Sequence, residues 1–387
     1  MATILKILQI CPYDIGRHGG VQRHILDLSA ALQRAGHTVA LIAPGAPSAP
    51  VAVGNALFAG SRRAVRMFGT AFELGWIRSG EMESLDGYLH DNAFDIAHFH
   101  TPWSPFVPYQ VLRRLAGSAT RCVATFHDTP PPTLGGGLRS MLYRVLSRRL
   151  SRRLDAAIAV STAPAGYLSL AGDCRLHLLP GCIDLAPVRA AGEHRPAGRL
   201  GGSILFVGRL EPRKGVEVLI RAFARLAQAL PDARLTICGD GAERPALQAQ
   251  AERLRLAGRI FFLGALDERG KLEQFASADL FCAPSPYGES YGLVLAEAMA
   301  AGLPVVAAAN SGYRTVLTEA GAAGLVPPGD AQALAAKLEQ FLRDPALRAG
   351  AAAWGREASR AADVDERLHE FLAIYAAARS KREAPGK

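Results

Sequence analysis

The sequence predicts an α/β protein with two doubly wound, Rossmann-like domains of similar length that face each other across a cleft. Three observations support this fold class. Apolar strand-like segments alternate with helices of ten or more residues, which is typical of parallel sheets with right-handed crossovers. The alternation stops between residues 189 and 202 and then restarts. The chain has 387 residues, too many for one ordinary core but enough for two.

The first domain is predicted to span residues 1–188. An amphipathic helix is expected over residues 21–36, because its apolar residues recur every three or four positions and Gly36 ends the pattern. Short apolar runs bounded by turn residues predict buried strands. These runs lie at residues 4–11, 38–44, 95–100, 121–127 and 156–161.

A linker is predicted over residues 189–202, where "RAAGEHRPAGRLGG" is rich in Gly, Pro and Arg and has no apolar period. The second domain is predicted to span 203–365, with further strands and helices in alternation. Its strands are expected at 203–208, 234–239, 260–264, 280–285 and 304–309, and its first helices at 215–230 and 246–258. A C-terminal helix within 366–387 carries Leu368, Phe371 and Tyr375, and we expect it to cross back toward the first domain.

Composition places the chain among globular proteins, because 49% of its residues are hydrophobic and 20% are charged. No apolar run approaches the length of a membrane-spanning helix. The start, "MATILKILQI", has no small-residue cleavage site and is not interpreted as a signal peptide. Six cysteines lie without metal-binding spacing, which is typical of reduced thiols in the cytosol. We therefore predict a cytoplasmic protein.

The net charge of +9 is concentrated in the first half of the chain. Residues 1–190 hold 19 Lys and Arg against 12 Asp and Glu, whereas the remainder holds 25 against 23. The segment 139–155 places six Arg among Met, Leu, Tyr and Val, and residues 61–69 form a second Arg and aromatic cluster. Such segments can bind anionic lipid, or simply present a solvated face. We predict peripheral association with the inner face of the cytoplasmic membrane. Nucleic acid is not expected, because no recognised binding motif is present.

Two features of the first domain follow strand ends, where ligands bind in open α/β sheets. Gly19 and Gly20 lie between a strand and a helix, so the backbone can approach a phosphate or a sugar hydroxyl, although a simple turn is the alternative. The dinucleotide-binding spacing of glycines is absent. His127 ends the strand "RCVATFH" and can either donate to a substrate oxygen or cap the loop.

The second domain opens with "FVGRLEPRKG", where Arg209 and Lys214 can clamp a diphosphate just beyond a strand end. Farther along, "YGESYGLVLAEAMAAGLPVV" carries Glu289 before or at the start of a helix and Glu297 about two turns along it. Residues at this spacing share a helix face, so both carboxylates are expected to point toward one bound sugar nucleotide. Because Ala, Leu and Met surround Glu297, an unpartnered carboxylate there would be costly. This favours a ligand over a solvated helix face.

Several segments occur together in an order that resembles family 4 retaining glycosyltransferases of the GT-B fold. They are "GGVQRHILDLSAALQRAGHTV", "ATFH", "GRLEPRKG" and "GESYGLVLAEAMAAGLPVVAA". The resemblance covers nearly the whole chain and is closest to the phosphatidylinositol α-mannosyltransferases, which use GDP-mannose on a membrane lipid. The stretch 99–105 and the loop after His127 differ from that subfamily, and both belong to the acceptor half.

The resemblance implies a role for each matching residue. Gly20 would approach the diphosphate, and His127 would contact the transferred sugar. Glu289 would bind sugar hydroxyls and Glu297 the ribose. Glu268, where the subfamily is expected to have Asp, would accept hydrogen bonds from guanine. The implied catalytic residues are His127, Glu289, Arg209 and Lys214. The implied donor-binding residues are Gly19, Gly20, Arg209, Lys214, Glu268, Lys271, Glu289, Ser290, Tyr291, Gly292, Leu293 and Glu297, and the acceptor-side residues are Tyr13 and Gln22.

A metal-independent transfer is expected, with retention of configuration implied by the resemblance. The sequence contains no D-x-D metal motif in a strand–loop context, and protein cations would stabilise the departing diphosphate instead. The implied reaction moves a hexose, in the first instance mannose from GDP-mannose, onto a lipid or lipid-linked acceptor. The alternatives are a UDP-glucose or UDP-N-acetylglucosamine transferase in polysaccharide or lipopolysaccharide synthesis, a non-catalytic nucleotide-sugar or lipid-binding module, and a soluble epimerase.

Overall fold

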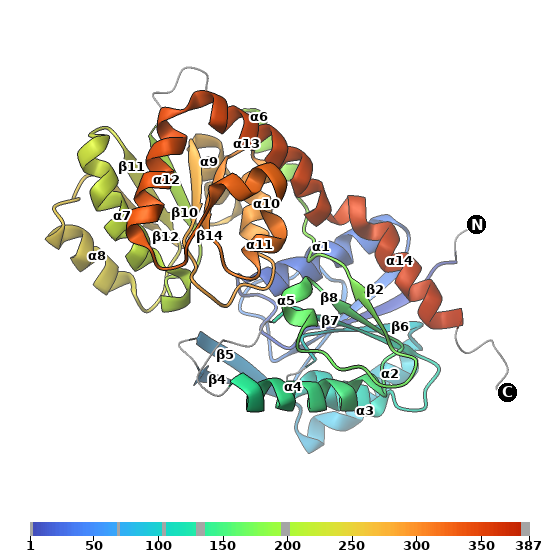
Figure 1. Ribbon diagram of the computed structural model, residues 1–387. Helices are drawn as coiled ribbons and strands as arrows, with labels where there is room; N and C mark the ends of the chain where they lie inside the picture. Colours follow the sequence, from blue (N-terminus) through green and yellow to red (C-terminus); the bar gives the residue numbers. More distant parts are fainter. Residues whose placement is uncertain (1–2, 68–69, 103–105, 129–135, 195–201, 381–387) are drawn as a thin grey trace. The chain divides into compact units, whose positions relative to one another are not determined.

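The computed structural model describes residues 3–67, 70–102, 106–128, 136–194 and 202–380, and it divides the chain into two compact units (Figure 1). Unit 1 comprises Met1–Ile183 together with Asp363–Lys387, and unit 2 comprises Asp184–Ala362. The division after Ile183 comes earlier than the predicted boundary at residue 188. Part of the predicted linker 189–202 is helical, since helix α6 spans Ala186–Glu193. Residues 195–201 of that linker lie outside the described residues.

Unit 1 contains a parallel sheet in the order β3-β2-β1-β6-β7-β8-β9. The order reverses between the neighbours β1 and β6, so the carboxyl ends of these strands form a topological switch point. The strands are β1 (Lys6–Ile10), β2 (Thr38–Pro44), β3 (Asn55–Ala59), β6 (Ile96–His100), β7 (Arg121–Phe126), β8 (Ala156–Ala159) and β9 (Arg175–Leu178). The helices are α1 (Gly20–Arg34), α2 (Met82–Asn92), α3 (Val107–Arg114), α4 (Gly136–Ser151), α5 (Thr162–Ala165) and α14 (Val364–Ser380).

A two-stranded antiparallel hairpin, β4 (Ser61–Met67) and β5 (Thr70–Trp76), follows β3 in unit 1. The basic cluster recognised in the sequence at 61–69 therefore lies mainly on a β-strand, and residues 68–69 are outside the described residues. The hairpin was not predicted from the sequence. Arg62 forms an ion pair with the buried Asp14, so this arginine is held against the sheet.

Helices cover both faces of the unit 1 sheet, because each face buries its own apolar cluster. Leu85 of α2, Val111 of α3 and Leu150 of α4 pack against one face. Leu28 of α1 and Phe371 of α14 pack against the other. The C-terminal helix therefore completes the core of unit 1, although it follows unit 2 in the sequence.

Unit 2 contains a second parallel sheet, in the order β12-β11-β10-β13-β14-β15. Its order reverses between β10 and β13, which defines the switch point of this unit. The strands are β10 (Ser203–Val207), β11 (Arg234–Cys238), β12 (Ile260–Gly264), β13 (Leu280–Ala283), β14 (Val305–Ala308) and β15 (Leu325–Val326). Besides α6, the helices are α7 (Val216–Ala229), α8 (Arg244–Arg253), α9 (Glu268–Ser277), α10 (Leu293–Ala300), α11 (Tyr313–Val316), α12 (Ala331–Arg343) and α13 (Pro345–Ala358).

A buried polar network fastens α14 to the sheet of unit 1. The Nδ1 atom of His98 lies 2.8 Å from the hydroxyl oxygen of Tyr375 on α14, and its Nε2 atom lies 2.7 Å from Oγ1 of Thr125 on β7. On the same strand as His98, His100 lies between Oε1 of Gln9, at 2.8 Å, and Nε2 of His127, at 3.0 Å. The network joins three strands and the C-terminal helix through groups that are almost inaccessible to water.

Burial keeps four neighbouring histidines of unit 1 neutral. It lowers the pKa of His24 from 6.5 to about 4 and that of His98 to about 3. It also lowers the pKa of His100 and of His127 well below 6.5, and the neighbouring imidazoles add to these shifts. The uncharged forms are favoured because protonation would place charge in a region with little solvent.

We expect the free energy of unfolding of unit 1 to fall steeply as the pH drops below 6.5. All four folded-state pKa values lie below the unfolded value, so acid protonates the unfolded chain first and stabilises it. At pH 5.5 each histidine lowers the free energy of unfolding by about 1.4 kcal/mol, and the four together lower it by roughly 5 kcal/mol relative to pH 7.5.

Chemical denaturation in metal-free buffer at pH 7.5 and pH 5.5 measures this difference. The variant His98→Gln should lose about a quarter of the pH dependence. His90→Gln is the matched control, since the His90 side chain is 90% exposed. Equal stabilities at the two pH values in the wild-type protein would contradict the expectation.

Candidate active site

A chain of alternating charges lies at the switch point of unit 2, on the loops that follow β10 and β13. Nζ of Lys214 donates a hydrogen bond of 2.6 Å to Oε1 of Glu289, and Nη1 of Arg213 lies 3.3 Å from the same oxygen. Glu211 joins the two arginines of the loop, with Oε2 3.1 Å from Nε of Arg213 and Oε1 2.8 Å from Nη1 of Arg209. The structure thus brings together three of the predicted catalytic residues, Arg209, Lys214 and Glu289, through their shared ionic partners.

Two glycines allow the backbone to pack closely around these charged side chains. Gly215 follows Lys214 with φ of +69°, and a Cβ atom there would lie 2.4 Å from the carbonyl oxygen of Pro284, just after β13. Gly312 is equally constrained, because a Cβ atom would lie 2.3 Å from the carbonyl oxygen of Glu289. Both positions therefore require glycine, and both fix the backbone on which the charged side chains stand.

The Lys214–Glu289 pair is largely withdrawn from solvent, with 15% of the lysine side chain and 10% of the glutamate side chain exposed. Burial lowers the pKa of Lys214, and the carboxylate of Glu289 opposes that shift. A cation in this position can interact strongly with an anion, because little water is present to screen it. Arg213 shares the carboxylate but was missed in the sequence analysis, where only Arg209 and Lys214 were assigned to the clamp.

Glu297 lies in the second turn of α10 and is also ion-paired, so the expected reason for a ligand beside it is wrong. Its Oε1 accepts a hydrogen bond of 2.7 Å from Nζ of Lys271, which extends from α9. Oε2 of Glu268 lies 3.1 Å from the same ammonium. Burial alone would lower the pKa of Lys271, but the two carboxylates outweigh it and the pKa is raised. The predicted donor residues Glu268, Lys271 and Glu297 thus form one cluster.

Glu289 and Glu297 do not share one helix face, which corrects the geometric argument made from the sequence. Helix α10 begins at Leu293, so Glu289 belongs to the preceding loop. The two carboxylates are held by different lysines from different elements. Any ligand that contacts both must therefore reach a loop carboxylate and a helix carboxylate with separate cationic partners.

The start of α10 is shaped by a left-handed glycine and a buried tyrosine. Gly292 has φ of +100°, and a Cβ atom there would lie 2.6 Å from the ring of Tyr313. The hydroxyl of Tyr313 lies 3.2 Å from Oγ of Ser285, and Nδ2 of Asn310 donates to the carbonyl oxygen of Ser285 at 2.8 Å. The predicted residues Ser290, Tyr291 and Leu293 flank this glycine in the sequence. No motif in the sequence identified the support that Tyr313 and Asn310 provide.

The remaining predicted residues all belong to unit 1. His127 follows β7 directly, Gly19 caps α1 and Gly20 is its first residue. The hydroxyl of Tyr13 lies 3.2 Å from Oδ2 of Asp128, and Nε2 of Gln22 donates to the carbonyl oxygen of Asp14 at 3.2 Å. Residues 103–105 and 129–135, which carry the predicted differences on the acceptor side, lie outside the described residues.

A hollow of about 680 Å³ lies beside the amino-terminal ends of β6 and β7, at the edge of the unit 1 sheet opposite to the carboxyl ends of its strands. Its three arginines already pair with aspartates: Arg114 with Asp86, Arg121 with Asp155 and Arg379 with Asp95. Because parallel sheets bind ligands at their carboxyl edge, this hollow is not the candidate active site.

Comparisons with known proteins match both halves of the chain. Residues 18–187 match the family model described as Glycosyltransferase Family 4, and residues 202–358 match the one described as Glycosyl transferases group 1. The chain is 33% identical to the phosphatidyl-myo-inositol mannosyltransferase of Mycobacterium leprae, over 96% of both chains. It is 34% identical to the enzyme of that name from Mycolicibacterium smegmatis, over 95% of this chain and 90% of the other.

Solved structures show the same fold at lower sequence identity. Sucrose-phosphate synthase from Thermosynechococcus elongatus superposes with a TM-score of 0.74 at 23% identity, covering 98% of this chain and 100% of the other. HepE from Anabaena, solved with UDP and glucose, superposes with a TM-score of 0.70 at 23% identity, covering 95% and 99%. The chain therefore belongs to the GT-B glycosyltransferases, in the same family as the phosphatidyl-myo-inositol mannosyltransferases.

Proposed function

We propose that this enzyme transfers mannose from GDP-mannose to a lipid acceptor, with phosphatidylinositol as the first acceptor to test. The observation that carries the proposal is near full-length identity of about one third to enzymes named phosphatidyl-myo-inositol mannosyltransferase. The cluster of Lys214, Arg213 and Glu289 at the switch point of unit 2 supports the chemistry, because it supplies buried cations next to a carboxylate.

The proposed mechanism follows from the charge that develops during transfer. When the sugar leaves the nucleotide, negative charge grows on the diphosphate, and cations placed there lower the barrier. Lys214 and Arg213 supply the positive charge in the proposed mechanism. Arg209, whose side chain is 46% exposed, adds a third cation at the edge of the cluster. Binding of a diphosphate would draw Lys214 from Glu289 and release carboxylate oxygens that can accept sugar hydroxyls. Transfer without a metal and with retention of configuration forms part of the proposal, on the family resemblance.

The preference for guanine rests on Glu268. Its carboxylate is 44% exposed and lies at the first turn of α9, where Lys271 holds it at 3.1 Å. A carboxylate accepts both the N1–H and the N2 amino hydrogens of guanine, and uracil cannot present such a pair of donors. This geometry favours GDP-mannose over UDP-hexoses as the donor.

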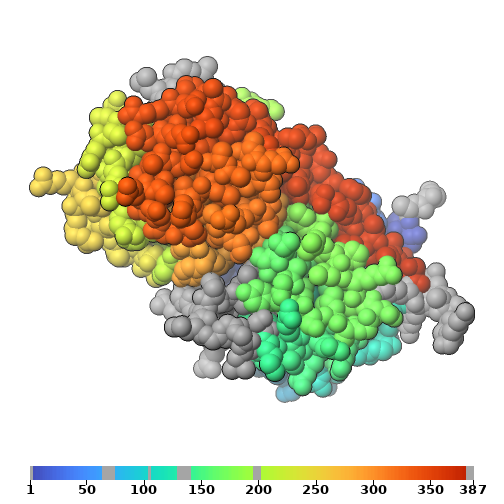
Figure 2. Space-filling model, viewed as in Figure 1, coloured from blue at the N-terminus to red at the C-terminus, as the bar shows by residue number. Residues whose placement is uncertain are grey.

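Helix α4 is the proposed membrane contact. Met141 and Leu142 are more than 60% exposed, and Val145 is 42% exposed on the same helix. Arginines flank these apolar side chains, and in Figure 2 the green segment that includes α4 lies on the surface. Exposed apolar side chains beside arginines suit the boundary of an anionic bilayer. Within the described residues, no helix is long and apolar enough to cross a membrane.

We expect Lys214→Ala to lower kcat about 10²–10³-fold, because it removes a buried cation that stabilises the developing diphosphate charge. Glu289→Gln should also lower it, because a neutral amide neither holds Lys214 nor accepts as strongly from sugar hydroxyls. The assay is transfer of radiolabelled mannose from GDP-mannose to phosphatidylinositol in vesicles. Lys337→Ala, on α12, is the control. Wild-type turnover in both site variants would refute the mechanism.

We expect Glu268→Gln to weaken GDP binding about 10- to 100-fold, because hydrogen bonds to a charged acceptor are lost. UDP binding should change little. Calorimetry with both nucleotides measures the effect, and Glu273→Gln on the exposed side of the same helix serves as the matched control. Tight UDP binding by the wild-type enzyme with no binding of GDP would replace the mannose donor with a UDP-hexose.

We expect vesicles rich in anionic lipid to bind the enzyme, and binding to weaken when four arginines at the end of α4 and just after it become serine. These are Arg148, Arg149, Arg152 and Arg153. Loss of four positive charges weakens attraction to the anionic surface. A matched variant replaces four exposed arginines of unit 2 by serine, namely Arg221, Arg225, Arg234 and Arg253. Co-sedimentation that falls equally in both variants, or in neither, would exclude α4 as the contact.

A further inference from the structure

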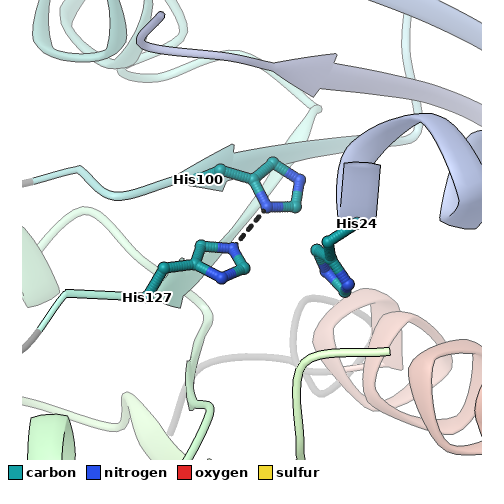
Figure 3. A group of neighbouring side chains, drawn as sticks. All are labelled: His24, His100 and His127. Atoms are coloured by element: carbon teal, nitrogen blue, oxygen red, sulfur yellow. Dashed lines mark hydrogen bonds between the residues drawn. The ribbon is translucent and has the colours of Figure 1, made fainter. Parts of the chain in front are cut away.

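Three buried histidines of unit 1 converge from three different elements (Figure 3). His24 lies in the second turn of α1, His100 is the last residue of β6, and His127 follows β7. One ring nitrogen of each lies within 4.8 Å of a ring nitrogen of both others. The ring centroids are 5.0 to 5.4 Å apart. His98 lies beside them, but both of its ring nitrogens already have hydrogen-bond partners.

The unused nitrogen is Nε2 of His24. The other ring nitrogen, Nδ1, faces the backbone of Cys182, 2.7 Å from its carbonyl oxygen and 3.1 Å from its amide nitrogen, so the ring fits there in either neutral tautomer. Nε2 has no hydrogen-bond partner among the described residues, and with the proton on Nδ1 it is a bare acceptor. The residue is completely buried. A buried polar atom without a partner is costly, and such atoms often mark the place of an absent ligand.

The two other rings are already oriented as metal ligands are. Nε2 of His100 lies 2.8 Å from Oε1 of Gln9, an acceptor, so Nε2 carries the proton and Nδ1 has a lone pair. That Nδ1 atom faces Nε2 of His127 at 3.0 Å, and the dashed line in Figure 3 marks this contact. Metal-binding histidines commonly donate their second N–H to a carbonyl or amide oxygen, as His100 does here to Gln9.

We propose that His24, His100 and His127 form a site for one divalent transition-metal ion. Imidazole ligands select zinc, cobalt, nickel or copper over magnesium and calcium, which prefer oxygen. Zinc–nitrogen bonds of about 2.0–2.1 Å place two tetrahedral ligands about 3.4 Å apart, close to the present spacing of His100 and His127. The ion takes the place of the hydrogen that Nε2 of His127 donates to Nδ1 of His100, and His127 changes tautomer by exchange with solvent, so that its Nδ1 carries the hydrogen and the ring stays neutral. His24 closes the site by a ring movement on the order of 1 Å.

Occupation of this site has a consequence that rests on the proposed function. His127 is the residue that resemblance assigns to the transferred sugar. Nε2 of His127 already faces His100, and a metal ion bound there places positive charge next to a sugar that itself becomes positively charged as it leaves the diphosphate. The ion therefore acts as an inhibitor and not as a cofactor. Binding itself requires only the three rings and is independent of the reaction.

The test begins with tag-free, metal-free protein and titrates it with Co²⁺ and with Zn²⁺. We expect one molar equivalent to bind, with visible Co²⁺ absorption typical of nitrogen ligands, and no binding of Mg²⁺. His24→Gln and His100→Gln should each weaken binding by more than about tenfold, as expected for loss of a ligand. His90→Gln, at an exposed position, should bind as the wild type does. Circular dichroism and thermal unfolding establish that each variant is folded.

Two results would overturn the proposal. One is a folded wild-type protein that takes up neither Co²⁺ nor Zn²⁺, or that binds them equally well in the His24 and His100 variants. The other is a thiolate charge-transfer band, which would assign the bound ion to cysteine. A second measurement compares mannose transfer with and without Zn²⁺, and inhibition should be relieved in His24→Gln relative to that variant's own rate. Metal binding without mannose transfer would refute the proposed function and leave the site standing.

Discussion

The ion pair between Lys214 and Glu289 is the interaction on which the candidate active site depends. It joins the loop after β10 to the loop after β13, the two strands between which the order of the unit 2 sheet reverses. A buried pair of this kind is costly to assemble, and removal of one partner leaves an uncompensated charge. Gly215 brings the two backbones close enough for this ion pair, because a Cβ atom there would lie 2.4 Å from the carbonyl oxygen of Pro284.

Most of both sheets could be predicted from the sequence, because strands buried on both faces read as continuous apolar runs. The strands at 38–44 and 121–127 are of this kind, and the structure contains β2 and β7 there. Among the strands that were missed are β9 and β4. The edge strand β9 is mostly exposed, so it has no apolar run, and β4 carries three arginines that suggested a surface cluster. In both, pairing with a neighbouring strand decides the structure, and the sequence of one segment does not contain that information.

The candidate site could also be predicted only in part from the sequence. The residue types that bear charge were recognised from motifs, but their partners were not. Glu297 was expected to need a ligand because its neighbours in the sequence are apolar, whereas Lys271 reaches it from a different helix. Arg213 lies within the recognised segment "GRLEPRKG" but was given no role, and Tyr313, which supports the start of α10, was not singled out at all. Contacts between segments far apart in the chain are set by the fold, and periodicity along one segment cannot reveal them.

The chain leaves unit 1 after Ile183 and returns to it at Asp363, so unit 2 is inserted within unit 1. Synthesis of unit 1 therefore begins first, but its hydrophobic core can be completed only after that of unit 2. Unit 2 is complete when residue 362 has been made, whereas the α1 side of the first sheet still lacks Phe371 and Tyr375. His98 gains the hydroxyl of Tyr375 only after residue 375 has been synthesised. During that interval an apolar surface of the first unit stands open, which makes the nascent chain dependent on α14 for protection from aggregation.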